Sequence, residues 1–212
     1  MLMGLPDRWD TCSRTTILGS SPSACASSGD TMAIGSHYCV YLLDVISGSR
    51  TSVLHLGSYV TTLALSLDGT LLVSSNSDKT VSLWDIQTGG VIGTLDDIPH
   101  VTAISISPNS TPIVLGTQDG TICFWDVRTG KSRFIEKNHG HKVSAIAFSP
   151  INSRRLVSSS YDGTVGQWDI EGHQVGVFNH GEPVWDIAYA SGGTHFISCT
   201  DKVATIREFG RW

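Results

Sequence analysis

The chain has 212 residues, of which 40% are hydrophobic and 16% are charged, and its formal net charge is −5. This length is enough for one well-buried domain, and the charged fraction lies below the roughly 25% of average soluble domains. No basic run alternates with aromatic residues, so direct nucleic-acid binding is disfavoured. No apolar run approaches the ~18 residues of a membrane span, so we expect no membrane insertion.

The cysteine pattern bears on the cellular compartment. The five cysteines are odd in number and widely spaced, and no C-x-x-C pair occurs, so they indicate reduced thiols rather than a disulfide framework. The segment MLMGLPDRWD lacks the basic start and the apolar core of a signal peptide. We therefore expect a cytoplasmic protein, with a nuclear location as the alternative.

In chain order, residues 1–14 show no strand periodicity, and we expect them to form a loose leader to a repeat domain over residues 15–212. Residues 15–18 form a short β-prone run. A first unit then contains segments that are typical of strands, because they are rich in β-branched residues or bounded by turn residues. These segments are 23–28, 31–34, 38–45 and 51–54.

The second and third units are cleaner copies of the same pattern, with Asp-led turns between the predicted strands. The predicted strands of the second unit are 60–66, 71–75, 81–86 and 91–95. The predicted strands of the third unit are 101–107, 113–116 and 121–127, and a hairpin follows at 128–130.

The fourth unit, residues 138–170, is the clearest copy. It holds a Gly-His pair, two alternating apolar segments, a serine-rich segment, an Asp-Gly turn and a closing Trp-Asp. The fifth unit has predicted strands at 184–189, 195–199 and 203–209 and lacks a fourth.

The units recur at a nearly constant period. Successive Trp-Asp pairs lie 41 and 43 residues apart, and an Asp-led turn precedes each pair. A period in the low forties that ends in Trp-Asp indicates one four-stranded sheet per repeat, arranged as propeller blades. The repeat anchors are Asp78, Trp84, Asp85, Asp119, Trp125, Asp126 and Asp169.

On these residues, the chain resembles the WD40 repeat family over roughly residues 12–209. The resemblance implies an all-β fold, a β-propeller of about five four-stranded blades. Such propellers usually have about seven or eight blades, so we favour an open arc or part of a longer propeller. The alternative is a ring in which residues 15–18 complete the last blade. An open arc would leave two blade faces uncovered, which favours association through them.

The resemblance also implies a structural hydrogen-bond set in the fourth unit. Its members are His141, a serine that is either Ser158 or Ser160, the turn residue Asp162 and the indole of Trp168. A buried indole N–H needs an acceptor, and a buried carboxylate needs donors. A Ser-His-Asp hydrolase is disfavoured, because its serine would sit on an exposed turn beside an oxyanion hole.

Motifs of other chemistry are absent from the sequence, including the P-loop, the dinucleotide fingerprint and H-E-x-x-H. His139 and His141 lie two residues apart, but a metal site would need further ligands. We interpret one of these histidines as structural and the other as a loop residue. We expect no catalytic residue, metal or cofactor.

The resemblance places partner-binding positions at the entry to the first strand of each unit and before each turn aspartate. Aromatic residues dominate interface hot spots, so Tyr59, Tyr161 and Trp185 are the favoured positions; for Trp185, packing in the core is the alternative. The candidate partner-binding residues are Tyr59, His100, Gln118, Lys142, Tyr161 and Trp185.

Three functions of different classes are compatible with this pattern. We favour a non-catalytic interaction scaffold that binds protein or peptide partners. The second hypothesis is the sensor array of a larger NACHT-type NTPase receptor, whose repeats resemble residues 42–54 and 66–92. The third is an enzyme that uses a propeller pocket.

Overall fold

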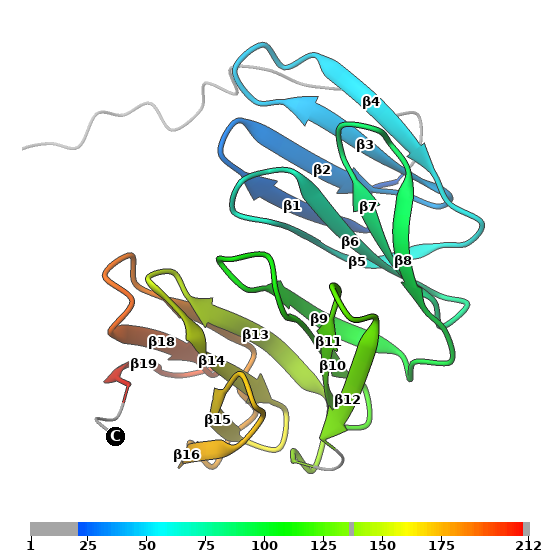
Figure 1. The fold of residues 1–212 in the computed structure, drawn as a ribbon. Coiled ribbons are helices and arrows are strands. Elements are labelled where there is room, and N and C mark those ends of the chain that lie inside the picture. The colour runs from blue at the N-terminus through cyan, green and yellow to red at the C-terminus, as the bar shows by residue number, and fades with distance from the viewer. Residues whose placement is uncertain (1–20, 136–137, 210–212) are drawn as a thin grey trace, which may run out of the picture.

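The computed structural model describes residues 21–135 and 138–209. These residues form nineteen strands in five antiparallel sheets and contain no helix (Figure 1). The proposed leader, residues 1–14, and the run 15–18 lie outside the described residues. In the described part of the chain, no helix has the length and hydrophobicity that a bilayer crossing requires.

The first two sheets are the first two blades, and each is a meander of four consecutive strands. The first blade contains β1 (Ala24–Ser28), β2 (Thr31–Gly35), β3 (Cys39–Asp44) and β4 (Arg50–His55). The second blade contains β5 (Val60–Leu65), β6 (Leu71–Asn76), β7 (Val81–Asp85) and β8 (Val91–Leu95).

The next two blades repeat this order. The third blade contains β9 (Val101–Ile106), β10 (Ile113–Thr117), β11 (Ile122–Asp126) and β12 (Lys131–Ile135). The fourth blade contains β13 (Val143–Ser149), β14 (Asn152–Ser160), β15 (Thr164–Asp169) and β16 (Gln174–Asn179).

The fifth blade has three strands in the described residues. They are β17 (Asp186–Tyr189), β18 (His195–Cys199) and β19 (Ala204–Glu208). The all-β prediction is therefore confirmed, and in the part of the chain that the structure describes the fifth sheet lacks a fourth strand, as predicted. Where strand bounds were predicted, they differ from the observed bounds by at most two residues. No bounds were predicted for β12 or for the four strands of the fourth blade.

The blades pack against one another through four separate apolar clusters, one for each pair of neighbouring blades. The tryptophan of each Trp-Asp pair packs against the preceding blade. Trp84 lies in the cluster with Val40 of the first blade, and Trp168 lies in the cluster with Val114 of the third. Both faces of the inner blades are therefore buried, which explains the imperfect alternation of their strands.

The fifth blade uses a different side chain for the same contact. Arg207 pairs with Phe196 across β18 and β19, as Trp84 pairs with Leu72 in the second blade. The Arg207 guanidinium lies 4.5 Å from the ring centroid of Phe178, a residue of the fourth blade. A cation–π contact thus replaces the packing of an indole.

A bulge near the start of the inner strand recurs in three blades. In two of them, the serine or threonine at the bulge forms a hydrogen bond to the next blade. The register between the first two strands shifts next to Thr102 and Ser144. Thr102 Oγ1 donates a hydrogen bond of 2.6 Å to the carbonyl of Val143, and Ser144 Oγ donates one of 2.6 Å to the carbonyl of Val184. These bonds fix the lateral position of each blade on the next.

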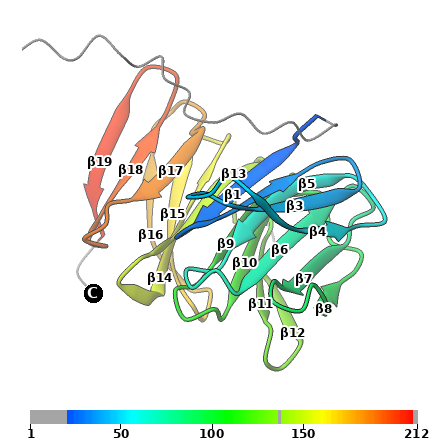
Figure 2. The same cartoon turned by 90° about the horizontal axis from the view of Figure 1, so that it is seen from above.

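The inner strands β1, β5, β9, β13 and β17 lie side by side in this order, so the blades form an arc. Figures 1 and 2 show the first and fifth sheets at the two ends of that arc. Among the described residues no strand of the fifth sheet pairs with a strand of the first. The fold is therefore a partial or open β-propeller, as the number of repeats predicted.

Candidate functional site

The candidate partner-binding residues lie at equivalent positions along one edge of the blades. In each of three blades, one backbone hydrogen bond joins the residue before the turn aspartate to the entry of the inner strand. Tyr161 N donates to the carbonyl of Lys142 at 3.1 Å, and Gln118 N donates to the carbonyl of His100 at 2.8 Å. In the second blade, the bond joins Ser77 to Tyr59 at 2.8 Å. This edge is called the loop rim below.

Four side chains gather on the loop rim where the fourth and fifth blades meet. The Tyr161 ring meets the Trp185 ring edge to face, with 4.7 Å between their centroids. The Lys142 ammonium lies 5.0 Å from the Tyr161 ring centroid, and the His141 ring stacks on Tyr161 at 6.0 Å. We call His141, Lys142, Tyr161 and Trp185 the aromatic rim patch.

Trp185 remains 46% exposed in this patch, which is unusual for so large an aromatic side chain. The alternative that Trp185 is a core residue is therefore wrong. Tyr161 is half-buried, and His141 is exposed. The patch thus presents a rigid aromatic surface beside a cation.

The other three candidates do not join the patch. Tyr59 is 39% exposed and packs edge to face on His37, with 5.2 Å between ring centroids. His100 and Gln118 are exposed residues of the third blade. The predicted set of six is therefore spread over four blades, and sequence reasoning omitted His141 from the surface set because it assigned that residue a buried role.

A chain of hydrogen bonds lies beneath the patch, inside the fourth blade. Trp168 Nε1 donates to Ser158 Oγ at 2.8 Å, and Ser158 Oγ lies 2.7 Å from His139 Nε2. His139 Nδ1 lies 2.8 Å from Thr164 Oγ1, which donates to Asp162 Oδ1 at 2.6 Å. We call these five residues the buried set.

The assignment of His141 to the buried set is wrong by two residues. His139 takes that position and is 2% exposed, whereas His141 Nδ1 accepts a hydrogen bond from Lys142 N at 2.8 Å. The open choice of serine is also resolved by geometry. Ser158 is the member, and Ser160 Oγ instead donates to the carbonyl of His141 at 3.0 Å.

The donors of the buried set determine the tautomer of His139. Thr164 Oγ1 donates its single proton to Asp162, so it must accept from His139 Nδ1–H. In a neutral ring the second nitrogen, Nε2, is then unprotonated and accepts from the Ser158 hydroxyl, whose oxygen accepts from Trp168. Every polar atom of the chain is thereby satisfied with a neutral imidazole.

Electrostatics agree with a neutral His139. Burial lowers the pKa of His139 below its usual value, and the nearby Asp162 carboxylate only partly offsets this effect. Burial alone would raise the pKa of Asp162, but hydrogen bonds from Thr164 and from the backbone of Gly140 outweigh it, so this pKa is lowered. Asp162 is therefore the single charge of the buried set at neutral pH.

Asp162 also holds the loop that carries part of the patch. Its Oδ2 accepts from Gly140 N at 2.6 Å, and its Oδ1 accepts from Thr164 N at 2.8 Å. The first bond fixes the residue that separates buried His139 from exposed His141. The buried set thus positions His141 and Lys142 beside Tyr161.

The other blades retain only parts of this set. In the second blade, Trp84 Nε1 donates to Ser74 Oγ at 3.0 Å. In the third blade, Leu115 occupies the serine position, because it pairs with Ile104 as Ser158 pairs with Ile146. In the fifth blade, His180 Nε2 lies 3.0 Å from Ser198 Oγ, so a His–Ser pair persists there without the indole.

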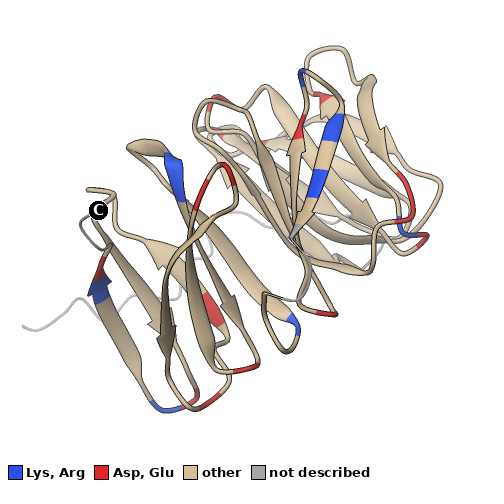
Figure 3. Cartoon of the chain, turned by 60° about the horizontal axis from the view of Figure 1, so that its bottom comes forward, with Lys and Arg blue, Asp and Glu red and all other residues tan. Residues whose placement is uncertain are grey.

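The aspartates of the repeat act as turn caps. Asp78 Oδ1 accepts from the backbone and the hydroxyl of Thr80 at 3.0 and 2.7 Å, and Asp119 Oδ1 accepts from Thr121 N at 3.2 Å. The aspartates of the Trp-Asp pairs cap the next hairpin in the same way. Asp85, Asp126 and Asp169 accept from backbone N–H groups within the hairpins that follow them. Asp and Glu gather mainly at such turns (Figure 3).

The described residues do not favour a metal site or a serine nucleophile. They contain no group of three or more His, Cys, Asp or Glu side chains that could hold a metal ion. The Ser158 hydroxyl is completely buried and engaged by Trp168 and His139. It cannot reach a substrate as a nucleophile would.

Comparison with known proteins agrees with this architecture. A β-propeller family model described as nucleolar protein 10-like, N-terminal domain, matches residues 14–202. No curated protein sequence matches the chain significantly. The resemblance of the first two units to NACHT-type receptor repeats stays a prediction. The match covers most of the chain, which therefore belongs to the β-propeller family of nucleolar protein 10-like N-terminal domains.

Proposed function

We propose that this protein is a non-catalytic scaffold that binds a protein or peptide partner through the aromatic rim patch. The observation that carries the proposal is the exposed Trp185 ring, which packs on the Tyr161 ring. The Lys142 ammonium lies over the same Tyr161 ring. Aromatic residues that are held rigidly and remain accessible are the commonest hot spots of protein interfaces. A β-propeller domain fits such a role.

The side chains of the patch favour a partner that is both apolar and acidic. Trp185 and Tyr161 offer apolar area, while Lys142 and His141 offer hydrogen-bond donors at its border. A peptide that presents one apolar side chain next to a carboxylate would satisfy both. Loop residues on a rigid sheet scaffold lose little conformational entropy when they bind, because the buried set already fixes the loop.

The name of the matched family refers to the nucleolus. We therefore propose a nuclear, nucleolar site of action in place of the cytoplasmic location favoured by the cysteine pattern. Fluorescence microscopy of the tagged chain tests this directly. Concentration in nucleoli is the expected result, and uniform cytoplasmic signal would contradict it.

Quantitative affinity capture from nuclear extract tests the partner surface. The bait proteins are the wild type, the double variant Tyr161→Ala/Trp185→Ala, and the control Tyr38→Ala, which removes a tyrosine that is 63% exposed on the first blade. We expect specific proteins to be lost with the double variant and retained with the control. Equal capture by all three baits would refute the assignment of the surface.

The fifth blade, which no other described blade covers on its outer side, provides a second contact surface. Ile206 is 71% exposed and Ile197 is 37% exposed, and these two residues pair across β18 and β19. Exposed apolar side chains that lie together favour association. We propose that this face associates with another protein chain. Sedimentation of the wild type and of Ile206→Lys should show association only for the wild type, and a monomeric wild type at all concentrations would argue against self-association.

A further inference from the structure

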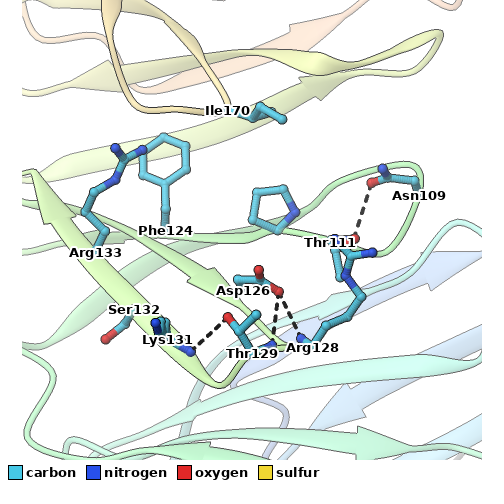
Figure 4. A pocket seen from close by; sticks show the side chains of 11 residues that line it. Asn109, Thr111, Phe124, Asp126, Arg128, Thr129, Lys131, Ser132, Arg133 and Ile170 are labelled. Carbon is cyan, nitrogen blue, oxygen red and sulfur yellow. Dashed lines mark hydrogen bonds between the residues drawn. The ribbon is translucent and has the colours of Figure 1, made fainter.

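A groove lies on the third blade, away from the aromatic rim patch, where this blade faces the fourth. Its volume is about 570 Å³, which is within the range of ligand-binding pockets. The hairpin between β11 and β12 forms one wall, the loop before Pro112 forms another, and Ile170 of the fourth blade closes the third side (Figure 4).

Basic side chains outnumber acidic ones in this groove. Arg128, Lys131 and Arg133 line it together with a single carboxylate, Asp126. None of these three cations forms an ion pair within the described part of the chain. Asp126 is already engaged, because its Oδ1 accepts from Arg128 N at 2.9 Å and from Thr129 N at 3.4 Å. The groove therefore has an excess of positive charge although the whole chain has a net charge of −5.

The equivalent groove of the fourth blade is neutralised. Glu171 follows the Trp-Asp pair of the fourth blade at the position that Arg128 has in the third blade, and it forms an ion pair of 2.6 Å with Arg154. Gly176 pairs with Gln167 of β15 as Arg133 pairs with Phe124 of β11. The cations are therefore a property of the third blade rather than of the repeat.

Strand β12 offers backbone hydrogen bonding to a ligand next to the cations. It pairs only with β11 in its sheet, so its other edge carries unpaired backbone donors and acceptors among the described residues. An extended peptide can add to such an edge as a further strand.

The two faces of β12 differ in chemistry. Lys131 and Arg133 alternate with Ser132 and Phe134, so the cations point to one face and the phenyl ring to the other. The Arg133 guanidinium lies 5.7 Å from the ring centroid of Phe124 on the groove face, and Figure 4 shows these two side chains next to each other. Phe134 is 42% exposed on the opposite face.

We propose that β12 and its groove bind an extended peptide in which acidic and aliphatic residues alternate. The acidic side chains meet Arg133, Lys131 and Arg128, the aliphatic ones cover Phe134, and the peptide backbone pairs with the free edge of β12. Nucleic acid fits this surface less well. Phe124 is only 5% exposed and cannot stack on a base, and the net charge of the chain repels polyanions.

Fluorescence anisotropy with the complete chain tests the proposal. The probe is a fluorescein-labelled octapeptide in which glutamate alternates with leucine. The matched control peptide has the same composition, with all glutamates preceding all leucines. We expect saturable binding of the alternating peptide and binding of the block peptide that is at least about tenfold weaker, because only alternation separates the two side-chain types onto opposite faces.

Variants locate the binding surface. Lys131→Gln and Arg133→Gln should each weaken binding about tenfold, since each removes a charge-assisted contact, and Phe134→Ser should weaken it as well. Arg154→Gln is the control, because its cation is already paired with Glu171. Circular dichroism verifies that each variant remains folded.

Three results would overturn the proposal. They are the absence of saturable binding, equal affinity for the alternating and block peptides, and unchanged affinity in both Lys131→Gln and Arg133→Gln. Labelled oligouridylate is measured in parallel. If it binds through the same cations more tightly than the alternating peptide, the groove is a phosphate-binding surface instead.

Discussion

The buried set makes a quantitative prediction for Ser158→Ala. The Ser158 hydroxyl accepts from Trp168 Nε1 at 2.8 Å and lies 2.7 Å from His139 Nε2. All three residues are at most 2% exposed, so water cannot replace the lost oxygen without a rearrangement. The substitution leaves one donor and one acceptor without partners.

Each unsatisfied buried polar group costs about 1–3 kcal/mol. Two such groups give an expected loss of about 2–6 kcal/mol in the free energy of unfolding. The second blade provides a matched control, because Ser74 is as buried as Ser158. Ser74 Oγ accepts from Trp84 Nε1, but it has no histidine partner, since Leu56 occupies the position that His139 has in the fourth blade. Ser74→Ala should therefore cost about 1–3 kcal/mol, the amount for one group.

Urea unfolding followed by tryptophan fluorescence measures both variants. At about 2–4 °C per kcal/mol for a chain of this size, the difference should also appear in Tm. If Ser158→Ala is no more destabilising than Ser74→Ala, then His139 contributes nothing through its bond to Ser158. The account of the buried set would then be refuted.

Three further predictions concern pH, thiol reactivity and packing. Burial lowers the pKa of His139 below 6.5, so the unfolded chain binds this proton more readily than the folded one. The stability from neutral His139 is thus complete above pH 6.5 and is lost as the pH falls below it. In urea unfolding across pH 5–7, the free energy of unfolding of His139→Gln should therefore vary less with pH than that of the wild type. An equal pH dependence in the two proteins would contradict this. Burial raises the pKa of Cys123 to about 12, so iodoacetamide should label Cys123 only after unfolding, while exposed Cys25 reacts in the native chain; native labelling of Cys123 would show that the blade interface opens. A Cβ at position 166 would lie 2.7 Å from Trp168 Nε1, so Gly166→Ala should destabilise the chain by about 1–3 kcal/mol, whereas Gly57→Ala, with open space around its Cβ, should not.

The repeat made most of the fold predictable from sequence. A tryptophan that packs on the preceding blade and an aspartate that caps the following hairpin must recur in register, so Trp84 and Asp85 identify one blade and Trp125 and Asp126 the next. These are local requirements of turn and packing chemistry. Most strands therefore followed from the sequence, with ends that differed by at most two residues. The outer strands β12 and β16 carry no such anchor and were not assigned individually.

The register of the histidine was harder to predict, because two histidines flank Gly140 and either could reach the blade interior. The repeat spacing identifies the correct histidine. His139 and His180 lie 41 residues apart, which is the repeat period, and each contacts a serine of the second strand of its blade. The gathering of Tyr161 and Trp185 was only partly predictable. Their contact depends on the rotation between two blades, which no local pattern encodes.

Hydrogen exchange at Gly140 tests most directly the claim that the buried set holds the partner surface in place. Its N–H donates to Asp162 Oδ2 at 2.6 Å, so the peptide covering residues 138–144 should be protected in the wild type. In Ser158→Ala, we expect exchange in this peptide to accelerate at least about tenfold, while the second blade retains wild-type rates. Unchanged protection of residues 138–144 in a destabilised Ser158→Ala would contradict the account.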